Sequence, residues 1–168
     1  MSLARGALGI AIALLLELGL GRFAPGAARY VDILMLPLAA YALRTSQRSA
    51  MVVGCASGLL QDYWTEPRLF GLNGLVKTVL GWALGGLGAR FDLNSFLGRF
   101  GAGASLHIVD VALEAGVRRL FGESLAPVSA PALLARGLAG GLLTAAVLAI
   151  VDRGAKRRTT SAPARRKA

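Results

Sequence analysis

The sequence predicts an all-α integral membrane protein, folded as a compact bundle of about six transmembrane helices. Hydrophobic residues make up 55% of the 168 residues, and the mean hydropathy is positive. Long apolar segments alternate with short polar connections, and basic residues are divided unevenly between alternate connections. A composition this apolar is typical of membrane proteins rather than of a small soluble domain.

Six apolar segments cover residues 6–21, 31–43, 50–63, 70–89, 96–117 and 132–151. A membrane span needs about 20 residues, and the last three segments reach that length. Segments 31–43 and 50–63 are short and must tilt or borrow flanking residues, so five spans is the alternative count. The first segment could be a signal peptide, but Glu17 interrupts it and no small-residue cleavage site follows, so we expect a retained helix.

The distribution of basic residues predicts the orientation of the spans, because basic residues favour the cytoplasmic side. Six spans place both termini on one side, together with Arg5, Arg44, Arg48, Arg90, Arg99 and seven basic residues of the C-terminal tail. The other side holds only Arg22, Arg29, Arg68, Arg118 and Arg119. We therefore expect a multi-pass protein with both termini in the cytoplasm.

The chain divides into a transmembrane helical domain at 1–152 and a basic cytoplasmic tail at 153–168, which we expect to be disordered. The net charge of +10 could indicate a nucleic-acid partner. The tail, however, has no interleaved aromatic residues and no nucleic-acid motif, so we expect none. We expect the tail to contact anionic lipid instead.

Metal and enzyme sites are not predicted. The chain has one cysteine, Cys55, and one histidine, His107, which excludes an internal disulfide and any site rich in Cys or His. Motifs of hydrolases, zinc proteases and nucleotide-binding enzymes are absent from the sequence. Ser105, His107 and Asp110 are too close on one helix to form a catalytic triad. We expect a protein without catalytic residues, metal or cofactor.

Glycines spaced by about four residues predict close contacts between helices. The candidate packing residues are Gly54, Gly58, Gly81, Gly85 and Gly88, and Gly137 and Gly141 have the same spacing. In lipid, helices associate through close backbone approach and dispersion, which small residues permit. These stripes could pack the bundle internally or form a docking face for another membrane protein.

Polar residues inside the fifth apolar segment form one stripe. His107, Asp110, Glu114 and Arg118 are spaced by three, four and four residues, which places them on one helix face. Glu114 and Arg118 are a favourable ion pair one turn apart. An ionised carboxylate in hydrocarbon costs at least a few kcal/mol, so we expect the stripe to face protein or water.

The predicted topology brings the other intramembrane polar residues to the same outer half of the bilayer. They include Glu17, Asp32, Asp62, Asn73, Lys77 and Arg136. We expect them to line a polar cavity or interface open to the outer side, with Lys77 paired to one of the acids. The candidate binding or interaction residues are Asp62, Asn73, Lys77, Asp110 and Glu114. Alternatively, these side chains reach separately to the lipid headgroups.

Two motifs in the middle of the chain resemble the MreD family of bacterial rod-shape-determining membrane proteins. They are G-L-L-Q-D at 58–62 and L-F-G-L-N-G-L at 69–75, followed by a glycine-rich helix that ends near Arg90. Residues 29–37, R-Y-V-D-I-L-M-L-P, are similar to an early stretch of that family, with Val31 where the family has proline. The resemblance covers roughly residues 25–120.

The resemblance implies a function. It implies a multi-pass protein of the bacterial cytoplasmic (inner) membrane that acts as a non-enzymatic scaffold in side-wall peptidoglycan synthesis and cell-shape maintenance. The implied partners are an MreC-like protein and, in the same elongasome complex, the MreB cytoskeleton, RodA and a class B penicillin-binding protein. The family also resembles the six-helix substrate-binding subunits of energy-coupling-factor vitamin transporters, so a transporter subunit is the alternative. Ala7 and Ala11 resemble the small-residue motif with which such subunits dock their coupling protein.

Overall fold

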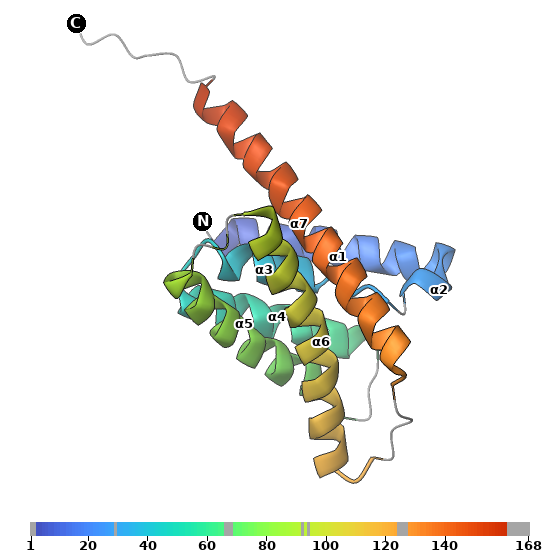
Figure 1. The fold of residues 1–168 in the computed structure, drawn as a ribbon. Helices are drawn as coiled ribbons and strands as arrows, with labels where there is room; N and C mark the ends of the chain where they lie inside the picture. The colour runs from blue at the N-terminus through green and yellow to red at the C-terminus, as the bar shows by residue number, and fades with distance from the viewer. Residues whose placement is uncertain are drawn as a thin grey trace, which may run out of the picture.

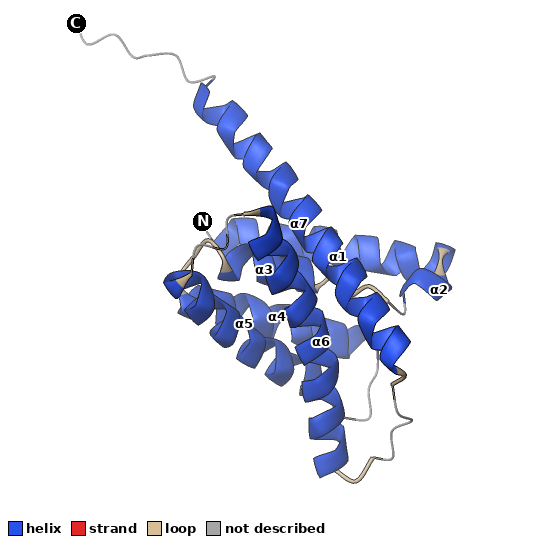
Figure 2. Ribbon diagram, in the orientation of Figure 1, coloured by secondary structure: helices blue, strands red, loops and turns tan. Residues whose placement is uncertain are grey.

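The computed structural model describes residues 3–28, 30–65, 69–91, 93, 95–123 and 128–160, and every regular element in them is an α-helix (Figures 1 and 2). The helices are α1 (Leu3–Phe23), α2 (Pro25–Ala28), α3 (Met35–Ala42), α4 (Gln47–Thr65), α5 (Leu72–Arg90), α6 (Phe96–Leu120) and α7 (Ala130–Thr160). The predicted all-α class is confirmed. Each of the six apolar segments contributes one long or short helix, and α2 is an additional single turn.

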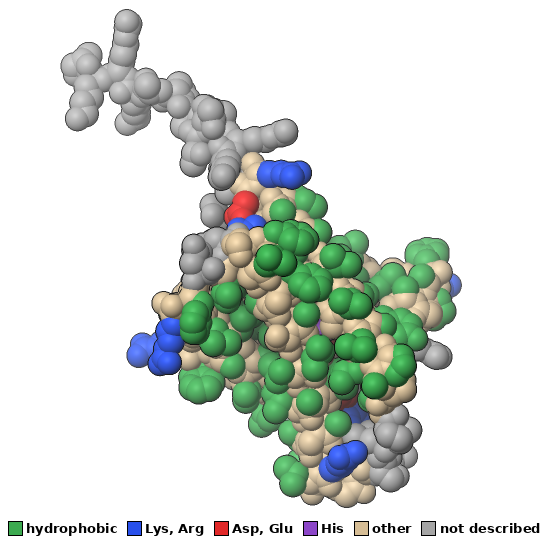
Figure 3. Space-filling view, in the orientation of Figure 1, with side chains coloured by type: hydrophobic (Ala, Val, Ile, Leu, Met, Phe, Trp, Pro, Cys, Tyr) green, Lys and Arg blue, Asp and Glu red, His purple; other side chains and the backbone are tan. Residues whose placement is uncertain are grey.

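The helices pack as a bundle in which α6 and α7 lie side by side; both contact α3, and α6 also contacts α5 (Figure 1). Within the described residues, three helices are long and apolar enough to cross a membrane, by length and composition: Gly6–Phe23 of α1, Phe96–Leu120, and Ala130–Arg153 of α7. Hydrophobic side chains predominate on the face shown in Figure 3, and Lys and Arg lie near its margins. This surface is typical of a protein that faces lipid.

An ion-pair cluster marks one end of the bundle. The carboxylate of Asp152, near the end of the apolar part of α7, lies 2.7 Å from Arg44, which follows α3, and 2.5 Å from Arg99, in the first turn of α6. We call this the Asp152 end. The opposite end, called the Arg118 end, contains the last turn of α6, the end of α4 and the beginning of α5. Helices α4 and α5 run antiparallel to each other, and so do α6 and α7.

Helix α3 is much shorter than the span predicted at 31–43. Its eight residues rise only about 12 Å, whereas the hydrocarbon core of a bilayer is about 30 Å thick. Pro37 lies in the first turn of α3, where its missing N–H is tolerated, and residues 31–34 form a turn before it. The chain therefore approaches the bundle centre in non-helical form, which brings Asp32 beside Gln61 of α4.

Helix α7 is longer than predicted. It continues to Thr160, nine residues past the predicted end at 151, so the first part of the predicted disordered tail is helical. The sequence explains this, because Ala, Lys and Arg favour helix and the first proline after 153 is Pro163. Residues 161–168, the rest of the predicted tail, lie outside the described residues.

The core of the bundle surrounds α3. Met35, Leu38, Ala39 and Ala42 are almost completely buried. On one side they pack against α5 and α6, through residues that include Leu72, Val76, Leu80, Leu84 and Leu106. On the other side, Leu34 and Tyr41 pack with Ile10 and Ala13 of α1. Helix α3 thus lies inside the bundle rather than against lipid.

All five predicted packing glycines lie at contacts inside the bundle. A methyl group on Gly54 or Gly58 would collide with the backbone carbonyl of Lys77 or Asn73, and one on Gly81 would lie 2.6 Å from the Ala50 carbonyl oxygen. A methyl group on Gly85 would lie 3.0 Å from Gln47 Cα, and one on Gly88 would lie 3.2 Å from the Ala42 carbonyl oxygen. The backbones of helices α4 and α5 are therefore in direct contact, which confirms the internal packing interpretation for these residues.

Candidate functional site: a buried polar cluster between six segments

Asp62 joins the end of α4 to the beginning of α5. Its side chain is fully buried. One carboxylate oxygen accepts hydrogen bonds from the Asn73 side-chain amide at 2.8 Å and from the Asn73 backbone N–H at 3.3 Å. The other accepts from the Gly74 backbone N–H at 3.2 Å. These N–H groups belong to the first turn of α5 and have no partner within their own helix. Asp62 is therefore a helix cap supplied by a neighbouring helix.

The geometry of Gly71 explains why the cap comes from outside. Gly71 is the N-cap residue of α5 and has a φ of +92°, a left-handed conformation that favours glycine. It has no side chain with which to accept a hydrogen bond, so Asp62 supplies the carboxylate. Gly58, one turn before Asp62, lets the Asn73 backbone approach α4. The residues of the G-L-L-Q-D and L-F-G-L-N-G-L motifs thus contact one another directly.

Lys77 is fully buried and donates a hydrogen bond to Asp32, which precedes α3. The predicted pairing of Lys77 with an acid is confirmed. Gln61 of α4 donates to the same Asp32 oxygen at 3.3 Å. The sequence predicts Asp32 at this level of the bundle, but the predicted site residues include neither Asp32 nor Gln61. The only sequence signal for Gln61 is its position next to Asp62.

Glu17 brings α1 into the cluster. Its carboxylate accepts a hydrogen bond from the backbone N–H of Leu34 at 3.1 Å. Leu34 is the N-cap residue of α3 and has no side-chain cap of its own. Glu17 also lies within electrostatic reach of Asp32 and Lys77. The acid that interrupts the first apolar segment therefore supports the beginning of α3.

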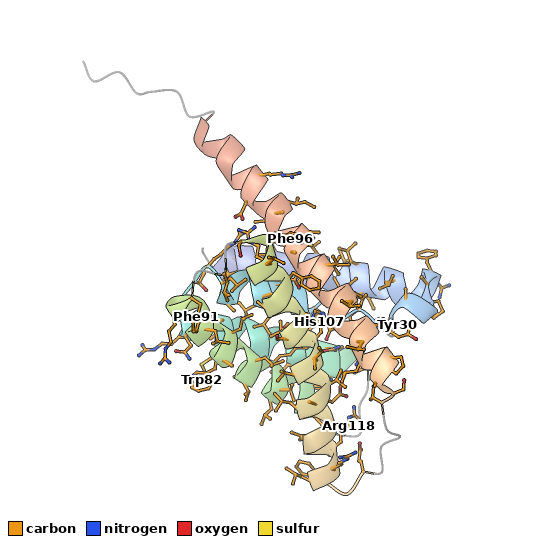
Figure 4. The ribbon with its side chains drawn as sticks, in the orientation of Figure 1. Tyr30, Trp82, Phe91, Phe96, His107 and Arg118 are labelled. Atoms are coloured by element: carbon orange, nitrogen blue, oxygen red, sulfur yellow. The ribbon has the colours of Figure 1, made fainter. Side chains whose placement is uncertain are left out.

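Helix α6 adds His107 and Asp110, which are both buried. Asp110 lies within electrostatic reach of Lys77 and Asp32, and of Arg136 on α7. His107 lies on α6 where α7 crosses it (Figure 4), and Gly140 of α7 makes room for its ring. The polar stripe predicted on this helix does face protein. Ser105, by contrast, is exposed on another face of α6.

Glu114 belongs to a separate ion-pair set at the Arg118 end. Arg118 donates to Glu114 at 3.0 Å and to Glu123 at 3.1 Å. The predicted pair of Glu114 and Arg118 is confirmed, and Glu123 is an additional partner. Glu114 lies within electrostatic reach of Asp110, so this set borders the buried cluster rather than forming part of its hydrogen bonds.

Two cavities lie near these residues. One, of about 470 Å³, lies between α1 and α4, and its lining includes Glu17, Arg22, Gln61, Trp64 and Thr65. The other, of about 470 Å³, is lined by Asp62, Tyr63, Trp64 and Phe70. The cavity between α1 and α4 is thus bordered by Glu17 and Gln61, whereas Asn73, Lys77 and Asp110 are buried and line neither cavity.

Comparison with protein families, with curated proteins and with solved structures gave no match. The fold and the site themselves define a class: an α-helical protein with helices able to cross a membrane and a buried polar cluster at its centre.

Proposed function

We propose that this protein is a non-enzymatic membrane scaffold that resembles MreD and holds an MreC-like partner in the cell-elongation machinery. The observation that carries the proposal is the direct bonding between the two motifs of the resemblance. Asp62 of the first motif caps Asn73 and Gly74 of the second, and Gly58 packs on the Asn73 backbone. The two motifs thus form one structural unit. A fold shared with the MreD family would require such a contact between them.

In this proposal the chain crosses the bacterial cytoplasmic membrane six times, with the turn at 31–34 and α3 together forming the second crossing. The Asp152 end lies in the cytoplasm. Its basic residues Arg44, Arg99 and Arg153 agree with that side, as the positive-inside rule requires. The end of α4 and the beginning of α5 then lie on the outer side.

The candidate residues determine shape rather than touch the partner. Asp62, Asn73, Lys77 and Asp110 are buried, so they set the positions of α3, α5 and α6. Contact with an MreC-like protein then falls on exposed apolar faces, such as Leu75, Val79 and Trp82 of α5, which follow one another at helical spacing. Trp82 projects from α5 away from the bundle (Figure 4).

Co-purification in mild detergent from the source bacterium tests this proposal. The tagged protein should retain the MreC-like protein and RodA, and Asp62→Ala should weaken that retention. Gly116→Ala is the matched control, because a methyl group there meets open space. Loss of the gene should widen or round the cells. Normal cell shape without the gene, together with no retained elongation protein, would overturn the proposal.

One alternative has its own observation. The cavity between α1 and α4 has the size of a small-molecule site, and Ala7 and Ala11 are both exposed on α1, where a coupling protein could dock. A substrate-binding subunit of a vitamin-type transporter would co-purify with a membrane coupling protein and an ATPase pair. Retention of these proteins instead of elongation proteins would favour the transporter.

A further inference from the structure

The cavity between α1 and α4 lies where both helices end. It has a volume of about 470 Å³, and its border includes Glu17 and Arg22 from the last turns of α1 and Gln61 and Thr65 from the last turns of α4. The apolar part of α1 ends at Phe23. Polar headgroups begin where the apolar part of a membrane-crossing helix ends, so the cavity lies near the depth of the headgroups.

Glu17 and Arg22 bring opposite charges to this cavity without pairing with each other. Both line it, and five residues of helix separate their Cα atoms by about 7.5 Å along the axis. Within the described ranges, none of the ion pairs includes either side chain. Lys77 lies within electrostatic reach of Glu17, but its ammonium is bonded to Asp32. The lining therefore offers one carboxylate and one guanidinium to charges on a ligand.

The hydrogen-bonding groups of the lining favour a ligand with N–H donors. Glu17 Oε2 accepts the Leu34 N–H, but a carboxylate has about four acceptor positions. Gln61 donates to Asp32 through its amide nitrogen, and its Oε1 has no partner in the part of the chain that the structure describes. The Thr65 hydroxyl donates to the Gln61 carbonyl, so its oxygen also remains an acceptor. A primary ammonium, with three N–H donors, suits such a set.

The rest of the lining favours an organic ligand. Leu14, Leu18 and Leu34 give the cavity apolar walls, and the ring of Trp64 can contact an ammonium group through its face. The guanidinium of Arg22 suits a phosphate, with which arginine forms two parallel hydrogen bonds. A ligand that satisfies both charged side chains carries an ammonium at one end and a phosphate at the other.

We propose that this cavity binds a zwitterion in which a short linker joins a primary ammonium to a phosphate, the chemistry of an ethanolamine headgroup. Glu17 holds the ammonium and Arg22 holds the phosphate. Two sources supply this chemistry: an ethanolamine phospholipid and a soluble phosphoethanolamine compound. For the lipid, the exposed Leu15 and Leu16 beside Glu17 give the acyl chains an apolar surface. The inference does not depend on the scaffold function, because binding can be measured without any partner.

Tryptophan fluorescence gives a direct test. The chain has two tryptophans, of which Trp64 lines the cavity and Trp82 lies on α5. The full-length Trp82→Phe protein in detergent is titrated with dihexanoyl phosphatidylethanolamine, with its choline analogue and with glycerophosphoethanolamine. The ethanolamine lipid should change the Trp64 fluorescence saturably. The choline analogue has no N–H donor on its ammonium and should bind about tenfold more weakly.

Variants of the two charged residues locate the site. Glu17→Gln keeps an oxygen for the Leu34 N–H but removes the charge, and should weaken binding of the ethanolamine lipid about tenfold or more. Arg22→Gln should have a similar effect, and it serves if Glu17→Gln does not fold, because Arg22 is exposed. Arg119→Gln is the matched control. It removes an exposed arginine of α6 that does not line the cavity, and binding should not change.

The soluble compound identifies the source of the ligand. Binding of the lipid alone assigns the site to a lipid headgroup, and similar affinity for glycerophosphoethanolamine assigns it to a soluble zwitterion; either result supports the site. Equal affinity for the ethanolamine and choline lipids, or no saturable binding of either ethanolamine compound, would overturn the proposal. Binding that Arg119→Gln weakens as much as the two cavity variants do, or that neither cavity variant weakens, would overturn it as well.

Discussion

The ammonium group of Lys77 is fully buried against the carboxylate of Asp32, although 45 residues separate them in the chain. This pair ties α5 to the turn that leads into α3. Because α3 is short and lies in the middle of the bundle, few other polar contacts hold that turn in place. The ion pair therefore positions the central helix.

Removal of one member of this pair should be far more damaging than removal of both. Lys77→Met leaves the Asp32 carboxylate buried without its cation, and we expect a loss of about 3–5 kcal/mol of stability. The double variant Lys77→Met with Asp32→Asn should recover most of this loss, because Gln61 can still donate to the amide oxygen that replaces the carboxylate. Thermal unfolding in detergent, followed by size-exclusion chromatography, measures both. Equal damage in single and double variants would contradict a direct pair.

The cap on α5 should be sensitive to the carboxylate of Asp62. Asp62→Ala leaves two first-turn N–H groups and the Asn73 amide without an acceptor, and we expect a loss of about 2 kcal/mol or more. Asp62→Asn retains one accepting oxygen and should lose less. Equilibrium unfolding in SDS-containing mixed micelles measures the difference. Glu123→Gln, at the partly exposed Arg118 set, is the control and should cost clearly less than Asp62→Ala.

The close contact of α4 with α5 should tolerate no added methyl group. Gly58→Ala collides with the Asn73 backbone and should destabilise by about 1–3 kcal/mol. Gly116→Ala is the matched control on α6, where a methyl group meets open space and the gain in helix propensity is about 0.8–1 kcal/mol. Both changes add the same methyl group, so a difference between them comes from their surroundings. We therefore expect Gly58→Ala to lower the melting temperature and Gly116→Ala to raise it. A similar effect of both would show that Gly58 is not at a close contact.

The cluster at the Asp152 end should depend on salt. Asp152→Asn removes the carboxylate that Arg44 and Arg99 share and leaves two cations close together. All three side chains are partly exposed, so we expect a loss of only about 1 kcal/mol, which shrinks at high ionic strength. Melting temperatures at low and high sodium chloride check this. A loss that is unchanged by salt would argue that the cluster acts through packing.

Features that depend on local patterns could be predicted from the sequence. Hydropathy located the helices, and the spacing of Glu114 and Arg118 predicted their ion pair, since both follow from the period of one helix. The identity of the acid that pairs with Lys77 could not be predicted, because it depends on how far α3 is displaced along the bundle. The short length of α3 could not be predicted either, because the apolar run at 31–43 does not distinguish turn from helix.

The contribution of Asp62 shows a second limit. The sequence predicts that this acid, at the end of an apolar segment, lines an interaction site. In the structure its carboxylate accepts hydrogen bonds from the first turn of the next helix. The missing information was the left-handed conformation of Gly71, which removes any cap from α5 itself. The sequence identifies His107 only as one member of a polar stripe. Its contact with the Gly103 carbonyl shows which ring nitrogen carries the hydrogen.

The glycine contacts between α4 and α5 also restrict how the molecule can move. Backbones in direct contact at Gly54, Gly58 and Gly81 cannot slide or rotate past each other without collision, and Asp62 ties the end of α4 to the beginning of α5. The hairpin therefore behaves as the rigid frame of the protein. Only 11% of the apolar part of α1, Gly6–Phe23, is buried inside the bundle, so this helix is held far less tightly. Any rearrangement that a partner induces should appear as motion of α1 against a stationary hairpin.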